Sequence, residues 1–163
     1  MNGRVLAAAA AAGIGVAVVV APASAGPLTP TTVTPTCQAS QLRPHFNGQQ
    51  GAAGTHFDLW RITNVGATCQ TIGFVGALNF GADGRPLPTT VNWIGAKHTV
   101  VLGHNKSAHW RFYFTNPGIL GCVPEAAANM IVTPPGNTSP VLAGRGERSC
   151  HGVFNASALE LGL

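Results

Sequence analysis

SAHWRFYFT, residues 107–115, carries the strongest fold signal in this sequence. Its large aromatic side chains recur at every second position, at Trp110, Phe112 and Phe114, and a charged residue, Arg111, falls between the first two. Successive side chains of a β-strand point to opposite faces of a sheet, so this period of two predicts a strand with one buried face.

Other short strands are predicted on both sides of this one, separated by turn residues. The predicted strands cover residues 38–46, 55–63, 69–80 in two segments bent at Gly73 or Gly76, 85–93, 99–102, 129–133 and 150–154. Asp83-Gly84 predicts a hairpin turn, because both residues tolerate a positive φ. Pro86 and Pro88 then confine the returning strand, 85–93, to the edge of a sheet.

This pattern favours an all-β domain, an antiparallel β-sandwich of seven or eight short strands. Helix signals are nearly absent after the N-terminal segment. We expect one domain over residues 37–163, a length that can bury a core. Within 55–63 we expect Phe57 and Leu59 on the core face, and Asp58 and Trp60 on the opposite face.

The N-terminus reads as an export signal. Arg4 precedes an apolar run, 5–20, and Ala23-Ser-Ala25 supplies the small residues of a cleavage site. We therefore expect a signal peptide over 1–25 that is removed, leaving no membrane span, and a Pro/Thr-rich linker over 26–36. No Cys stands directly after the expected cut, which argues against a lipid anchor. The expected location is secreted, extracellular or in the cell wall.

Four cysteines follow the signal, and an exported chain is expected to oxidise them. Three pairings are possible. We favour Cys37–Cys69 and Cys122–Cys150, because these pairings close loops that are local in sequence, and each such loop stabilises by roughly 3–4 kcal/mol in the chain-entropy model. The cysteines lack the C-x-x-C spacing of a zinc site.

The composition argues against nucleic-acid binding. Nine Lys and Arg residues against five Asp and Glu residues give a formal net charge of +4, and charged residues make up 9% of the chain. So mild a surplus, spread along the sequence, indicates ordinary solubility.

An ordered set of residues in this chain resembles a known family, the actinobacterial secreted domain of unknown function 4232. The set is Cys37, Leu42, Gly51-Ala-Ala-Gly54, Thr63-Asn-x-Gly66-x-x-Cys69, Gly73-Phe74, Asp83-x-x-Pro86, Leu102 before Ala108, Cys122-x-Pro124, Pro134-Pro-Gly136 and Cys150. The resemblance spans about residues 37–154. It implies an immunoglobulin-like sandwich in an exported protein and supplies no catalytic residues. The chain departs from the pattern at Val75 and at His104-Asn105, where members carry proline and Pro-Gly.

No motif in the sequence assigns a chemistry. There is no G-x-S-x-G, and Ser149 beside His151, with Asp58 as the nearest third member, is interpreted as a chance neighbour. The six histidines contain no H-x-H pair, so we expect no metal site and no cofactor. The acidic residues are interpreted as single solvated side chains: Asp58, Asp83, Glu125, Glu147 and Glu160.

Three functional hypotheses remain. The first is a secreted or cell-envelope-associated, non-enzymatic binding module, monomeric, for an unknown protein or cell-wall glycan. Its candidate residues are Trp60, Arg61 and Tyr113, with the loops 103–106 and 137–148. The second is an extracellular hydrolase with an unrecognised site, which a pocket of convergent His, Ser or carboxylate groups would favour. The third is a structural spacer domain.

Overall fold

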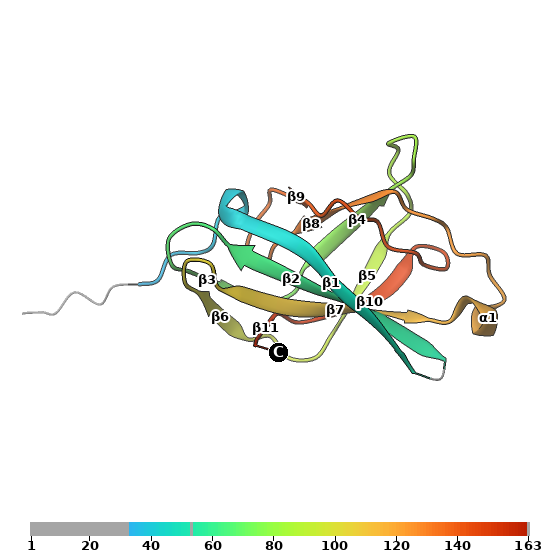
Figure 1. Cartoon of the computed structure of the whole chain (residues 1–163), viewed down its shortest axis with the longest axis horizontal. Helices are drawn as coiled ribbons and strands as arrows, with labels where there is room; N and C mark the ends of the chain where they lie inside the picture. The colour runs from blue at the N-terminus through green and yellow to red at the C-terminus, as the bar shows by residue number, and fades with distance from the viewer. Residues whose placement is uncertain (1–32, 53, 163) are drawn as a thin grey trace, which may run out of the picture. The chain divides into compact units, whose positions relative to one another are not determined.

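The computed structural model describes residues 33–52 and 54–162, and they form a mostly β domain (Figure 1). The predicted signal peptide, 1–25, lies outside the described residues, as does the predicted linker up to residue 32. The strands are β1 (Leu42–Ala52), β2 (Thr55–Asn64), β3 (Cys69–Ile72), β4 (Gly76–Phe80), β5 (Thr90–Ile94), β6 (Thr99–Leu102), β7 (Ser107–Thr115), β8 (Asn129–Thr133), β9 (Val141–Leu142), β10 (Val153–Ser157) and β11 (Glu160–Leu161). The described helices are a 3-10 turn at Ala39–Gln41 and the single turn α1 (Pro117–Leu120).

The strands form three sheets. The largest has the order β1-β2-β7-β10-β5, with β11 also paired to β7. Strands β3 and β6 form a second sheet, and β4, β8 and β9 form a third, which lies at the top of the view in Figure 1. The paired strands are antiparallel except for β5 and β10, which run parallel.

One hydrophobic core joins the three sheets. The predicted inner row of β7 is confirmed, since Trp110, Phe112 and Phe114 are all buried. The smaller sheets contribute Val100 and Leu102 of β6 and Met130 and Val132 of β8 to the same cluster of buried side chains. The smaller sheets therefore cover the inner face of the six-stranded sheet.

The predicted orientation of β2 is wrong, although Leu59 is buried as predicted. Trp60 and Asp58 point into the core, where Trp60 has no exposed surface, and Phe57 faces outward and stays half-buried. Apolar residues occupy both faces of this strand, so its alternation is ambiguous. The observed orientation buries Trp60 and Ile62 together, and this outweighs the cost of turning one carboxylate inward.

The described residues contain eleven strands instead of the predicted seven or eight. The additional ones include β9 and β11, of two residues each; β9 lies in a segment predicted as a loop. The Asp83-Gly84 turn forms, but its returning arm makes only a bridge at Pro86 before the chain crosses to the six-stranded sheet as β5. Strand β5 does lie at an edge, as predicted, although its pairing is parallel.

Both predicted disulfides are confirmed: Cys37 pairs with Cys69, and Cys122 pairs with Cys150. The first attaches the start of the domain to β3, and the end of the predicted linker also joins this strand, because Thr36 bridges Gln70. Within residues 33–52 and 54–162, no helix is long and apolar enough to cross a bilayer.

The close approach of Gly152 to Pro88 gives a test of the β5–β10 arrangement. Gly84 and Gly152 both have a left-handed φ, +76° and +70°. A Cβ on Gly84 would meet nothing within 4 Å, whereas a Cβ on Gly152 would collide with the carbonyl oxygen of Pro88. We expect Gly84→Ala to lower the free energy of unfolding by about 1 kcal/mol. We expect Gly152→Ala to lower it by at least about 2 kcal/mol more, since the backbones must separate. Urea unfolding of the oxidised proteins measures both, and equal losses would contradict the contact.

Candidate functional site

A cavity among the described residues has a volume of about 450 Å³. It lies where β1, β2 and the end of β7 meet the segment 145–150. Its lining comprises Gln49, His56, Asp58, Phe114, Thr115, Pro124, Arg145, Glu147, Arg148, Ser149 and Cys150. The volume falls in the range of sites that hold small ligands.

A buried ion pair lies at one side of this cavity. Asp58 points inward from β2, and its side chain is only 2% exposed. Arg145 Nη2 donates to Asp58 Oδ2 over 3.2 Å, and 47% of the Arg145 side chain remains exposed. The Arg145 guanidinium also lies over the Phe46 ring, 3.8 Å from its centre. Arg145 therefore neutralises a buried charge while reaching solvent.

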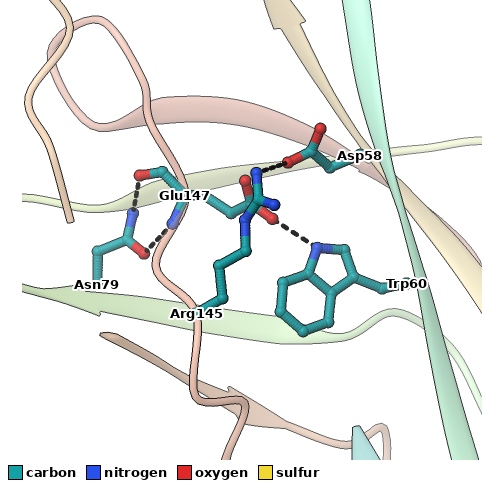
Figure 2. A network of polar contacts seen from close by, with 5 residues as sticks. All are labelled: Asp58, Trp60, Asn79, Arg145 and Glu147. Atoms are coloured by element: carbon teal, nitrogen blue, oxygen red, sulfur yellow. Dashed lines mark hydrogen bonds and ion pairs between the residues drawn. The ribbon is translucent and has the colours of Figure 1, made fainter. Parts of the chain in front are cut away.

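Glu147 lies beside this pair and is buried from its backbone to its carboxyl group (Figure 2). Its Oε1 accepts a hydrogen bond from Trp60 Nε1 at 2.5 Å. Its backbone is held by Asn79, whose Nδ2 donates to the Glu147 carbonyl and whose Oδ1 accepts from the Glu147 N–H, each at 3.1 Å. These bonds fix Glu147 from two sides.

The Glu147 carboxyl group keeps its proton at neutral pH. The pKa of Glu147 is raised to about 9, chiefly because burial penalises the charged form, and also by its hydrogen bond to Asp58 and by the Asp58 charge. The Trp60 hydrogen bond and the Arg145 charge oppose this rise. Asp58 Oδ1 is buried and has no other hydrogen-bond partner among the described residues, so it is available to accept from protonated Glu147. Because Glu147 is neutral, Arg145 faces one ionisable carboxylate, Asp58, instead of two.

The segment 145–150 is also held at other points. The N–H of Glu125 donates to the Ser149 carbonyl, and Cys150 is bonded to Cys122. Gly146 lies so close to Ala127 that a Cβ there would be 2.6 Å from the Ala127 backbone. Only glycine fits this approach without a shift, so the sequence allows the segment to close over Asp58.

The remaining polar groups lie at the cavity wall and rim. Arg148 is exposed, and Ser149 is buried. His56 points to the same face of β2 as Asp58 and stacks on Phe114, with ring centres 5.1 Å apart. Arg145 and Arg148 both bring positive charge to the cavity, and protonated Glu147 adds no negative charge.

This geometry does not match the common hydrolytic arrangements. A glycosidase needs two carboxyl groups separated by about 5 Å or more, whereas Asp58 and Glu147 hydrogen-bond to each other. Ser149 and Asp58 do line one cavity, but the histidine there is His56, and His151 is not part of the lining. Among the described residues, no group of three His, Cys, Asp or Glu side chains is placed to hold a metal ion.

The comparison with known families agrees with this framework. A family model described as a domain of unknown function, DUF4232, matches residues 37–160. The chain belongs to this family. The matched region includes both disulfides, Asp58, Glu147 and the whole cavity lining. No curated protein and no solved structure matches the chain.

The structure separates the three candidate residues expected on the surface of this DUF4232 domain. Trp60 lies in the core, so it cannot contact a ligand at the surface. Arg61 and Tyr113 both lie on the outer face of the six-stranded sheet, the face that points away from the core. There Tyr113 packs on Phe57, with ring centres 5.6 Å apart. Tyr113 and Arg61 are both half-buried, and neither lines the cavity.

Sequence reasoning also missed the acid pair of the DUF4232 domain. Asp58 and Glu147 were interpreted as single solvated acids, yet both are buried and joined by a hydrogen bond. The contact joins positions far apart in the chain, so no spacing rule could find it. One signal was available in the sequence: Asp58 lies two and four positions before Trp60 and Ile62, so all three side chains share one face of the strand. That places a carboxylate among apolar side chains.

The raised pKa of Glu147 predicts how stability depends on pH. The folded state binds one more proton than the unfolded state between the unfolded value of 4.5 and the folded value of about 9. The Glu147 contribution is therefore complete below pH 4.5 and is lost as pH rises toward 9, by at most about 1.4 kcal/mol per pH unit. Glu147→Gln keeps the donor to Asp58 and the acceptor from Trp60. We expect its free energy of unfolding to match the native protein near pH 5 and to exceed it increasingly up to pH 9.

Glu125→Gln is the matched control, because Glu125 is exposed and its side chain is outside the acid pair. Denaturant unfolding at several pH values measures all three proteins. If Glu147→Gln ran parallel to the native protein across this range, the raised pKa of Glu147 would be refuted.

Proposed function

We propose that this DUF4232 domain is a secreted or cell-envelope-associated, non-enzymatic binding module, and that the cavity is its ligand site. The observation that carries the proposal is the contrast between the acids and the bases of the cavity. The acids Asp58 and Glu147 are buried and bonded to protein groups, while Arg145 and Arg148 are exposed. The charged groups free to meet a ligand are cationic.

The exposed arginines favour a ligand that carries a carboxylate or phosphate group. Guanidinium groups bind such anions through paired N–H donors. One guanidinium nitrogen of Arg145 donates to Asp58 Oδ2, and the guanidinium lies over the Phe46 ring. The orientation of Arg145 is therefore set before a ligand binds. A pre-oriented group loses less entropy on binding. An acidic protein segment and an acidic cell-wall glycan both carry this chemistry.

The two disulfides support an extracellular site of action, because such bonds persist in oxidising compartments. The proposal retains the resemblance to actinobacterial secreted proteins, with release after cleavage near Ala25. It also retains an immunoglobulin-like sandwich, supported by the single core between the six-stranded sheet and the two smaller sheets. A rigid sandwich that holds loop residues in place is a common binding scaffold.

Arg148→Gln tests the ligand site. Arg148 is exposed, so we expect the variant to keep the native unfolding midpoint while losing most retention on purified cell-wall material. The same loss is expected in the shift of melting temperature that citrate or inorganic phosphate produces in the native protein. Both readouts depend on an anion meeting the Arg148 guanidinium.

Arg85→Gln is the matched control, because it removes the same charge from an 86% exposed side chain in the Asp83-Gly84 turn. Equal losses in both variants would show that only overall charge matters and would reject the cavity. Native retention by Arg148→Gln would reject it as well.

An extracellular hydrolase is the second candidate, and one observation favours it. His56, Ser149 and a carboxyl pair line the same cavity, which is the convergence expected of a hydrolytic site. Turnover of p-nitrophenyl acetate that is lost in both His56→Ala and Ser149→Ala would support this function. Turnover that is absent, or unchanged in both variants, would leave binding as the function of the cavity.

A further inference from the structure

The two edges of the six-stranded sheet differ in how they are protected. Strand β1 forms one edge and carries Arg43, Pro44 and His45, followed by a register shift between Phe46 and Gly48. Charges, proline and bulges are the features that keep sheet edges from pairing with other chains. The sequence of β1 therefore disfavours pairing of this edge with another chain.

Strand β5 forms the other edge and has none of these features. Its sequence is TVNWI, Thr90–Ile94, without charge or proline, and its parallel pairing to β10 has no register shift. Trp93 is 60% exposed and Ile94 is 41% exposed. A short, uncharged strand of high β-propensity with exposed apolar residues is suited to strand addition.

The pairing with β10 shows which backbone groups of β5 point outward. Thr90 N–H donates to the Gly152 carbonyl, which places Thr90 toward β10. Along a parallel strand the direction alternates, so Asn92 and Ile94 also bond β10, while Val91 and Trp93 direct their N–H and C=O groups to the open edge. No backbone hydrogen bond among the described residues reaches that edge of β5.

We propose that the β5 edge pairs antiparallel with the β5 edge of a second copy of this chain, which joins two six-stranded sheets into one. A strand can pair with its own copy only if equivalent side chains do not repel each other. Thr90–Ile94 has no charged side chain, so this condition holds. The β1 edge would place Arg43 and His45 near their own copies.

The side chains flanking β5 fit a self-pairing edge better than a charged partner. Trp93 stacks on Phe74, with ring centres 5.7 Å apart and planes 10° apart, so its ring is held in place while most of its surface remains open. Val153 of the neighbouring strand is 45% exposed. An uncharged edge that exposes Trp93 and Ile94 is complementary to another copy of itself, and a two-fold axis supplies one. This proposal departs from the monomer expected from the sequence.

Trp93→Pro and Trp93→Thr together test the edge. Proline removes the outward N–H of Trp93 and leaves the bonds to β10, whereas threonine removes the indole and keeps the N–H. Because the dimer is two-fold symmetric, the proline substitution removes this hydrogen bond once from each copy. In sedimentation equilibrium of the oxidised protein, we expect the native chain to form a concentration-dependent dimer. We expect Trp93→Pro to weaken association at least about tenfold relative to Trp93→Thr.

Asn92→Lys is the second variant, for the case in which proline disturbs folding, and circular dichroism checks each fold. Its lysine places like charges at the shared edge, so the dimer should weaken as ionic strength falls. A native chain that stays monomeric up to millimolar concentration would overturn the proposal. So would equal dimerisation of the native protein and both Trp93→Pro and Asn92→Lys.

Discussion

The hydrogen-bonded pairing of β2 with β7 determines which side chains of these strands enter the core and which face outward. Residues 55–63 pair with residues 107–115, and Trp60 lies directly opposite Trp110. The two indoles stack with ring centres 5.8 Å apart, on the face that the smaller sheets cover. Once this aromatic pair is inside, the parity of β2, meaning which alternate residues face the core, is fixed. Asp58 must then point into the core, and Arg61 must point out.

That parity creates an electrostatic problem that the segment 145–150 solves. An isolated carboxylate in an apolar core is costly, and it is tolerated when it is paired and hydrogen-bonded. Arg145 supplies the opposite charge, and Glu147 supplies a proton instead of a second negative charge. Trp60 contributes to both halves of this arrangement, since its ring fills the core and its N–H binds Glu147. The cavity is therefore a consequence of how the core is closed.

The sequence predicted the features that depend on neighbouring residues. The strands 99–102 and 129–133, the aromatic face of β7 and the two local disulfides follow from alternation and short loops. The features it missed depend on distant contacts. Glu147 and Trp60 are 87 positions apart, and the orientation of β2 depends on competition between two apolar faces. The parallel pairing of β5 with β10 joins the middle of the chain to its end, so no local sequence pattern could predict it.

The anchoring of 145–150 also bears on how the domain can change its partner. Asn79 holds the backbone at Glu147, and the Cys122 disulfide holds Cys150, while the exposed side chain of Arg148 lies between these two fixed points. A substitution at position 148 can change the charge or the size of the side chain on the cavity rim without altering the backbone path on either side. In the proposed binding module, recognition and folding are thus assigned to different residues of one short segment, and specificity can diversify at little cost in stability.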